Sequence, residues 1–431
     1  MLLFFMLLTL IIFIIVLSVL VFVHELGHFW VARKMGVKVE EFGFGLPPRA
    51  IGALKFQGER MLPLEQADTI EVSENLFGEE KIHEELAEIG LVEKIKRWKF
   101  FWGERLPDPI EGFQADDTVY SINWLPLGGF CKIKGENGEN ETDQDSFVAK
   151  KIWQRIAIIS AGVVMNIFLA MALFAAGYMI GLPQSVDDNS SQKYISGEKI
   201  QIVEVLPDTP AAKAGLRAGD VVETIDGNKF KSDAALRNYV NSRSGKILDY
   251  RISRADKIFD YKITPAVANG KGEIGIAIVN TGLVRYPWYL AIWKGISTAV
   301  ILLGVIIVAF YDLIKNLILG HGLSAEISGP VGIATMTGQY ARMGFVYLLQ
   351  FVGLLSLNLA VVNFFPFPAL DGGRIVFLLI EKIKGSPVKR EVEAAIHNVG
   401  FIALILLVLA ITVKDISHYT APLVNLFHKI F

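Results

Sequence analysis

The chain has 431 residues, of which 52% are hydrophobic, and its formal net charge at pH 7 is -2. A mean hydropathy of +0.43 is too high for a purely soluble protein of this length. The nearly neutral charge gives no support for nucleic-acid binding. A single cysteine, Cys131, excludes an internal disulfide framework and a cysteine-rich metal site. Any metal held by this chain must therefore be bound by His, Asp or Glu.

The first apolar run begins at the initiator methionine and carries no charge before His24. Leu2 to Val23 would form about 33 Å of helix, enough to cross a bilayer core of roughly 30 Å. A signal peptide would show a positive amino-terminal region, a shorter apolar core and a small-residue cleavage site. None of these is visible, so we expect residues 1–32 to hold a retained transmembrane helix.

Three further apolar stretches, within residues 156–184, 345–374 and 396–414, predict transmembrane helices. The mixed polar segment 33–155 contains "TVYSINWLPLGGFCKIKGE". Its alternation predicts a strand, and its glycine pair, Gly128–Gly129, predicts a tight turn.

Basic residues near membrane ends favour the cytoplasm. They follow the first helix, precede the second and lie between the last two: Arg33, Lys34, Lys38, Lys150, Lys151, Arg155, Lys382, Lys384, Lys389 and Arg390. All are cytoplasmic together if the amino terminus lies outside, which also places the polar segment 185–280 outside. A single crossing by residues 288–319 would invert the last basic loop. We therefore expect interfacial or re-entrant helices there, with a plain fifth span as the alternative.

The stretch "VFVHELGHFW" ends the first apolar run with two histidines and a glutamate. In a helix, His24 and His28 share one face, so both imidazoles can bind one Zn²⁺ while Glu25 acts as general base. This short pattern also arises by chance, and a pair of histidines near the lipid headgroups is the simpler alternative. Ionisable groups at the end of a membrane helix nevertheless need a partner.

The best candidate for a third ligand is Asp371 in "NFFPFPALDGGR". Pro366 and Pro368 interrupt the helix before it, and Gly372–Gly373 allow a turn. Taken alone, Asp371 could simply cap a helix end that faces water. Because it falls at the cytoplasmic end of a helix running in the same direction as the first, we favour the metal-ligand interpretation.

These motifs resemble those of the site-2 protease family of intramembrane zinc metalloproteases, in particular the bacterial branch that cleaves anti-sigma factors. "HELGH" fits HExxH, "NFFPFPALDG" fits N-x-x-P-x-P-x-L-D-G, and "SGPVGIA" is similar to the segment before the third core helix. The resemblance implies that His24, His28 and Asp371 bind Zn²⁺ and that Glu25 is the catalytic base.

The same resemblance implies a substrate-binding role for Asn358 and Asn363, with interhelical hydrogen bonding as the structural alternative. It also implies substrates that are single-span membrane proteins, namely anti-sigma factors already cleaved outside and remnant signal peptides. The protein would then lie in the bacterial cytoplasmic (inner) membrane as a multi-pass protein. Strands of the cytoplasmic region could pair with unwound substrate, although a purely structural hairpin is equally compatible.

Residues 57–117 depart from the family pattern, which joins the two strand regions more briefly. Within them, "EEKIHEELAEIGLVEKIKRWKFFW" has helical spacing and an aromatic cluster at its end. We expect an amphipathic helix at the cytoplasmic membrane face. His83 and Glu84 are interpreted as part of its solvated face.

Residues 196–281 contain "VEVLPDTPAAKAGLRAGDVVETIDGNKF", which resembles the PDZ core of bacterial periplasmic proteases. Such a domain could capture a peptide or the ectodomain of a substrate, or exclude bulky substrates sterically, and we favour the steric role. The predicted fold is a polytopic α-helical membrane protein. It has four transmembrane helices, a membrane-associated cytoplasmic β-rich region and one extracytoplasmic PDZ domain.

Two other functions fit parts of the sequence. A non-catalytic PDZ membrane scaffold with a structural metal site would need no base, which the presence of Glu25 disfavours. Another HExxH membrane protease, such as a prenyl-protein endopeptidase, would take its third ligand from a different motif and would lack a PDZ insertion.

Overall fold

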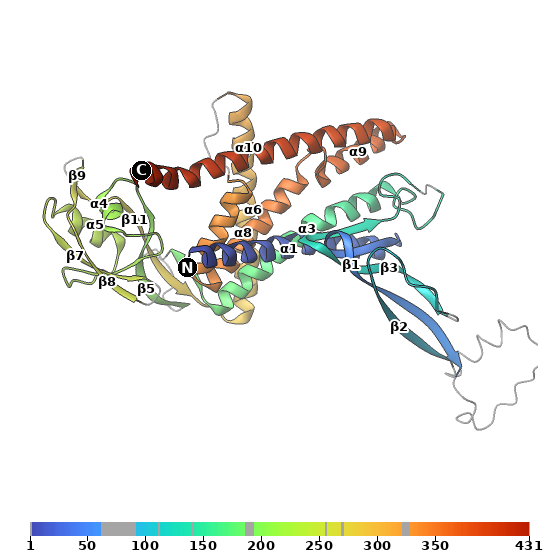
Figure 1. Ribbon diagram of the computed structural model, residues 1–431, viewed down its shortest axis with the longest axis horizontal. Coiled ribbons are helices and arrows are strands. Elements are labelled where there is room, and N and C mark those ends of the chain that lie inside the picture. The colour runs from blue at the N-terminus through green and yellow to red at the C-terminus, as the bar shows by residue number, and fades with distance from the viewer. Residues whose placement is uncertain are drawn as a thin grey trace, which may run out of the picture. The chain divides into compact units, whose positions relative to one another are not determined.

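A computed structural model describes residues 2–61, 92–110, 113–139, 142–185, 194–254, 257–268, 271–320 and 328–430 (Figure 1). The helices are α1 Leu2–Lys34, α3 Ile152–Ile180, α4 Pro210–Ala214, α5 Asp233–Asn241, α6 Trp288–Ile318, α7 Pro330–Met343, α8 Phe345–Phe364, α9 Asp371–Lys384 and α10 Arg390–Ile430. The strands are β1 Val39–Met61, β2 Val92–Trp102, β3 Phe113–Ile133, β4 Leu182–Ser185, β5 Ile195–Val205, β6 Val221–Ile225, β7 Leu248–Arg254, β8 Lys257–Ile263, β9 Ala266–Ala268, β10 Lys271–Glu273 and β11 Ile276–Val284.

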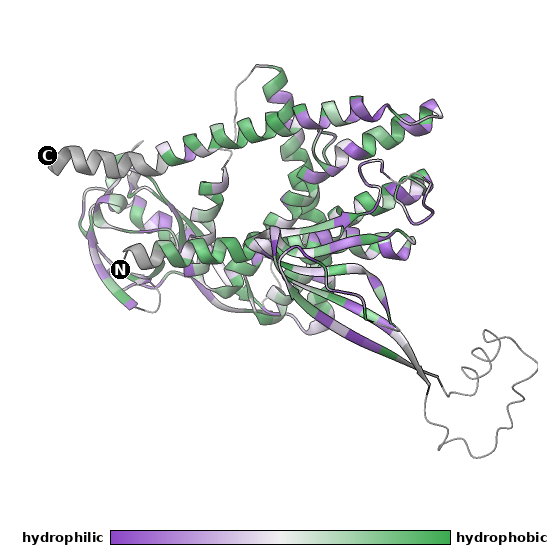
Figure 2. Ribbon diagram, turned by 45° about the vertical axis from the view of Figure 1, so that its right-hand side comes forward, coloured by the Kyte–Doolittle hydropathy of each residue, from purple (hydrophilic) through white to green (hydrophobic). Residues whose placement is uncertain are grey.

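Five of the described helices are long and apolar enough to cross a membrane. They comprise Met6–Lys34, Ile152–Ile180, Trp288–Ile318, Phe345–Phe364 and Arg390–Ser417, and Figure 2 shows the apolar residues along them in green. Each of the four predicted spans falls in one of these helices. The count of four is not confirmed, because α6 also qualifies by length and composition.

The chain forms two compact units, and helices α1, α3, α8 and α10 each contribute to both. We call Ile14–Asn166 with Leu359–Leu407 the HExxH unit, since both histidines lie in it. The second unit consists of Met1–Phe13, Ile167–Asn358 and Val408–Phe431.

The sheet of the HExxH unit has the strand order β2-β1-β3, and both β1 and β3 turn back within their length. Phe42 of β1 pairs with Tyr120 on one side and with Cys131 on the other. The chain of β3 therefore reverses between these two residues, which confirms the turn predicted near Gly128–Gly129. Gly128 has a φ of +85°, a conformation that favours glycine.

Strand β2 corrects the second part of the amphipathic helix predicted within residues 57–117, whose first part lies outside the described residues. Val92–Trp102 is a strand paired in register with Ile51–Met61 of β1. Phe101 is buried beside Leu54 and Phe56, whereas Phe100 and Trp102 are exposed. Pairing with β1 and burial of alternate residues therefore outweighed the local helical preference. His83 and Glu84 lie outside the described residues.

The six-stranded domain in the second unit has the strand order β4-β11-β5-β6-β7-β8. Its core contains Ile202, Ile225, Leu248 and Ile252, all at most 1% exposed. Thr209 caps the short helix α4 by accepting a hydrogen bond from Ala212 N. Strand β6 lies in "GDVVETIDG" of the PDZ-like segment.

Helix α6 is continuous, so no turn of a re-entrant segment lies within it. Near its start, Ala291 packs in one cluster with Tyr178 at the end of α3 and Leu182 just after it. Val346 at the start of α8 packs against the same cluster. The main chain thus leaves this cluster along α6 and has returned to it where α8 begins.

Two Arg–Asp pairs in the six-stranded domain give a matched stability test. Asp220 is 1% exposed and accepts two hydrogen bonds of 2.6 Å from Arg254. Asp260 and Arg251 form an ion pair in which both side chains are more than half exposed. Asp220→Asn should lower the free energy of local opening by about 3 kcal/mol, because it leaves a partly buried cation unpaired. Asp260→Asn should lower it by less than about 1 kcal/mol.

Hydrogen–deuterium exchange of the β6 and β7 amides in the full chain measures both values. Equal effects of the two substitutions would show that burial of Asp220 does not govern its contribution.

Candidate metal centre

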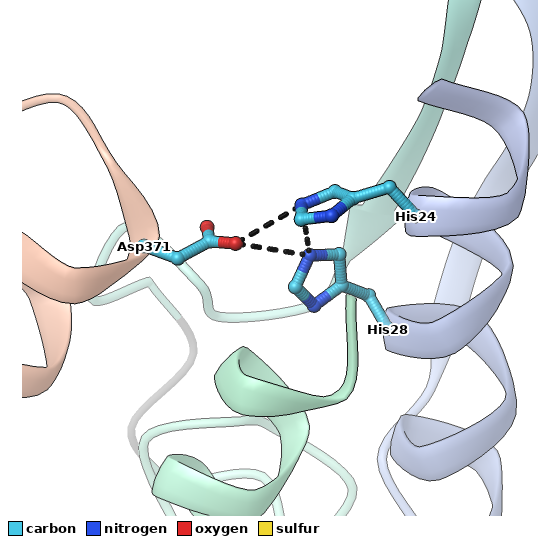
Figure 3. A group of neighbouring side chains, drawn as sticks. All are labelled: His24, His28 and Asp371. Atoms are coloured by element: carbon cyan, nitrogen blue, oxygen red, sulfur yellow. Dashed lines mark hydrogen bonds and ion pairs between the residues drawn. The ribbon is translucent and has the colours of Figure 1, made fainter. Parts of the chain in front are cut away.

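The HExxH motif lies near the carboxyl end of α1, where His24 and His28 occupy successive turns of one helix face (Figure 3). Both residues are buried, with exposed fractions of 5% and 9%. An imidazole on an apolar helix must find a polar partner when it is removed from water. The two rings meet each other, with their Nε2 atoms 3.2 Å apart.

Asp371 reaches this pair from the opposite side, as Figure 3 shows. Helix α8 ends at Phe364, and Asp371 is the first residue of α9. The turn between them is tight, since a Cβ at Gly372 would lie 2.2 Å from the Phe364 carbonyl oxygen. Glycine is therefore required there to bring the carboxylate to its place.

The three ligand atoms form a nearly equilateral triangle. Asp371 Oδ2 lies 3.0 Å from His24 Nε2 and 3.5 Å from His28 Nε2, and the two nitrogens are 3.2 Å apart. Two ligands of a tetrahedral zinc ion with bonds of about 2.0–2.1 Å lie about 3.3–3.4 Å apart. The donor set and its spacing therefore fit a zinc ion with a fourth position left for another ligand.

The carboxylate of Asp371 is suited to a cation. Its Oδ2 atom faces both Nε2 atoms, and an ionised carboxylate offers only acceptor lone pairs, as a metal ligand requires.

The other ring nitrogens are held by α3. His28 Nδ1 lies 2.9 Å from the Ile158 carbonyl oxygen, an acceptor, so Nδ1 carries the proton and Nε2 is left for a metal. The Asn166 Nδ2 atom lies 3.2 Å from His24 Nδ1, so α3 contacts the outer nitrogen of this ring as well.

Close approach of α1 and α3 depends on two glycines. A Cβ on Gly27 would lie 2.3 Å from the Ala161 carbonyl oxygen. A Cβ on Gly162 would lie 2.5 Å from His28 Nε2 and 2.7 Å from His24 Nε2. Gly162 therefore leaves open the space in front of the two candidate ligand atoms.

Of the other three predicted site residues, Glu25 and Asn363 lie close to the metal centre, whereas Asn358 belongs to the second unit. Glu25 is half-buried and close enough to interact electrostatically with His24, His28 and Asp371. Asn363 has its Nδ2 atom 3.3 Å from His24 Nε2, so it borders the centre. Asn358 belongs to the second unit, where its Nδ2 donates to the Leu354 carbonyl oxygen of its own helix.

The turn of β3 is tied to α1 just before the histidines. Ser18 Oγ donates to the Pro126 carbonyl oxygen and accepts from Gly128 N. Burial raises the pKa of the Cys131 thiol, and the negative charge of nearby Glu25 raises it further. A Cβ on Gly129 would lie 3.4 Å from Phe22 Cα, so the segment of β3 after the turn runs beside α1 just before the histidines.

Sequence reasoning missed three supports of the centre: Gly162, Asn166 and His397. His397 on α10 accepts a hydrogen bond from Ala369 N in the loop that carries Asp371. The i, i+4 spacing of Gly162 and Asn166 was the available signal for the first two, since it places both on the helix face that meets α1. His397 had no signal, because its partner is a main-chain amide.

Comparison with known proteins gives one family. The model of peptidase family M50 matches residues 12–60 and 97–407 and leaves out most of the 57–117 segment. The regulator of sigma-W protease RasP of Bacillus subtilis is 31% identical over 95% of this chain and 98% of its own length. The zinc metalloprotease RasP of Geobacillus kaustophilus is 30% identical over 94% of this chain and 97% of its own.

Among solved structures, the PDZ domain of an SdrC-like protein from Listeria monocytogenes is 31% identical to this chain. The match covers 20% of this chain and 90% of that one, with a TM-score of 0.18.

Gly162→Ala tests the geometry of the centre directly. The added methyl group would occupy the space in front of both Nε2 atoms, so the zinc content of the purified chain should fall from about one ion per chain to roughly a tenth or less. Gly304→Ala is the matched control, because a Cβ there meets nothing within 4 Å in another membrane-type helix. Full zinc occupancy in Gly162→Ala, measured by elemental mass spectrometry, would contradict this geometry.

Proposed function

The chain belongs to peptidase family M50 and is a zinc metalloprotease with several membrane-type helices, and from this premise we propose that it is an intramembrane endopeptidase. It hydrolyses peptide bonds in the transmembrane segments of single-span membrane proteins. The observation that carries this proposal is the triangle of ligand atoms from His24, His28 and Asp371. His24 and His28 lie in a candidate membrane span, and Asp371 follows closely after another.

In this proposal His24, His28 and Asp371 hold Zn²⁺, and Glu25 is the general base. When bound, zinc supplies Lewis acidity, which activates water for attack and polarises the scissile carbonyl group. Glu25 takes the proton of the attacking water and passes it to the leaving amine. Glu25 follows His24 directly on α1 and lies close enough to interact electrostatically with all three ligands. This position supports its role as the base.

A helical substrate has its carbonyl groups already hydrogen-bonded, so it must unwind before it can be cleaved. Asn363, beside His24, is placed to hold the opened chain through its amide group. For Asn358 the substrate-binding role stays a prediction. Its amide oxygen would make the contact, because its Nδ2 already donates to the Leu354 carbonyl oxygen. The edge of β3 at residues 129–132 offers a second contact, since within the described residues only β1 pairs with this segment.

The proposed substrates are anti-sigma factors already cleaved outside and remnant signal peptides. A relative of this chain carries the name regulator of sigma-W protease, which supports the first class. The six-stranded domain acts as a PDZ domain that excludes substrates with bulky ectodomains or captures a peptide. We place the protein in the bacterial cytoplasmic membrane with this domain outside and the sheet of β1, β2 and β3 in the cytoplasm.

We further propose four crossings, with α6 lying along the outer interface and not crossing the membrane. The packing of Ala291 and Val346 in one cluster supports this arrangement, because a single crossing by α6 would start α8 on the opposite side. The metal centre supports the same orientation for α1 and α8, because each helix ends near it.

Glu25→Gln tests the mechanism on a truncated single-span substrate in membranes. Glutamine keeps the size of the side chain but cannot take a proton, so the cleavage rate should fall about 10²- to 10⁴-fold while zinc stays bound. Glu204→Gln, on an exposed position of β5, should cleave like wild type. Cleavage at the wild-type rate in Glu25→Gln would remove the proposed mechanism and would favour a structural metal site.

Leu319→Cys tests the topology in a Cys131→Ala background, which has no other cysteine. A membrane-impermeant maleimide should label it from the same side as Glu204→Cys in the six-stranded domain, because α6 does not cross. Lys384→Cys at the end of α9 should be labelled from the opposite side. Labelling of Leu319→Cys only from the side of Lys384→Cys would establish a fifth crossing.

A further inference from the structure

Helix α9, which begins with the candidate ligand Asp371, is tied to α3 at its other end. Arg155 in the first turn of α3 forms an ion pair with Glu381 in the last turn of α9. Arg155 is 8% exposed, and the Glu381 side chain is 18% exposed. Two charges removed from water to this degree must stay together, because separating them would leave an unpaired buried charge.

One face of α3 carries both this arginine and the groups that contact the histidines. The members of this face, at spacings of three, four and four residues, are Arg155, Ile158, Gly162 and Asn166. The Ile158 carbonyl oxygen contacts His28 Nδ1, and the Asn166 amide contacts His24 Nδ1. The place of α3 is therefore fixed relative to both histidine rings.

Helix α9 presents a matching face. Its members, at spacings of three, four and three residues, are Asp371, Arg374, Leu378 and Glu381. Leu378 is 7% exposed and belongs to the buried cluster that contains Ile158 of α3 and Ala32 of α1. Arg374 pairs with Glu136 after β3, but these side chains are 34% and 30% exposed, so their pair holds α9 less firmly.

The two faces run antiparallel, so the ion pair and the metal centre lie at opposite ends of α9. Asp371 meets the histidine rings beside Gly162, and Glu381 meets Arg155 near the start of α3. From Asp371 to Glu381 the helix rises about 15 Å. Apolar packing has no direction, so by itself it lets a helix slide or turn slightly. An ion pair joins two defined groups and thereby fixes the height and rotation of α9 along α3.

We propose that Arg155 and Glu381 are positioning residues of the zinc site. Their ion pair sets the place of the Asp371 carboxylate relative to the two imidazoles. This inference rests on the proposed metal centre, whose bonds to nitrogen and oxygen of about 2.0–2.2 Å leave little room for a displaced ligand. Arg155, one of the basic residues that indicate the cytoplasmic side, thus has a second role, because its side chain is buried in an ion pair.

Charge exchange tests the pair through the zinc affinity of the purified full chain, measured by competition with a chelator. Arg155→Glu and Glu381→Arg each bring like charges together, so each should weaken zinc binding by about tenfold or more. The double exchange restores opposite charges and should bind zinc more tightly than either single variant. The exposed pair of Lys132 and Glu40 gives the matched control, and Glu40→Lys should leave zinc affinity within about twofold of wild type.

Arg155→Leu combined with Glu381→Leu separates positioning from stability. Two leucines can pack in place of a buried ion pair without loss of stability, but they define no fixed height for α9. The midpoint of thermal unfolding of the zinc-free chain in detergent should therefore match or exceed that of wild type. Zinc binding should still weaken by about tenfold or more. The visible spectrum of Co²⁺ bound in place of zinc should change, because it reports coordination geometry.

Two results would overturn the proposal. The first is a zinc affinity and a Co²⁺ spectrum that stay as in wild type in the leucine variant. The second is a zinc affinity that falls in the leucine variant only together with the unfolding midpoint, because the pair would then act on folding alone. A wild-type chain that binds no zinc would instead contradict the metal centre itself.

Discussion

The structure of the HExxH unit depends on one constraint: three ionisable side chains at the ends of apolar helices must satisfy one another. His24 and Asp371 are separated by 347 positions in the chain, yet their ligand atoms lie 3.0 Å apart. Two buried imidazoles and a carboxylate without this contact would each lose their interactions with water and gain nothing in return. The contact therefore fixes where the turn after α8 lies relative to α1.

The neighbouring features follow from that contact. Gly27 and Gly162 let α1 and α3 approach closely enough for Ile158 and Asn166 to hold the outer nitrogens of the two histidines. On the other side, His397 holds the loop that carries Asp371. The metal centre thus has supports on α3 and α10, and its ligands come from α1 and α9. Such outer contacts orient ligands and maintain metal affinity.

Much of the candidate site could be predicted from the sequence, because helical spacing alone puts His24 and His28 on one face and Asp371 follows an interrupted helix. The turn of β3 was also predictable from its glycines. The strand at Val92–Trp102 was not, since its local spacing suits a helix and only pairing with β1 decides the outcome. His397 acts through a contact with the main-chain amide of a distant residue, Ala369, which composition and periodicity do not encode. Asn358 and Asn363 have the same residue type, but only Asn363 lies beside His24.

The central claim is that one zinc ion is bound by residues from two distant segments of the chain. X-ray absorption at the zinc edge of the purified protein, compared between wild type and Asp371→Ala, tests it most directly. The account predicts two imidazole nitrogens at about 2.0–2.1 Å with oxygen ligands in wild type, and loss of one oxygen with at least about tenfold weaker zinc binding in the variant. An unchanged spectrum and unchanged zinc affinity in Asp371→Ala would contradict it.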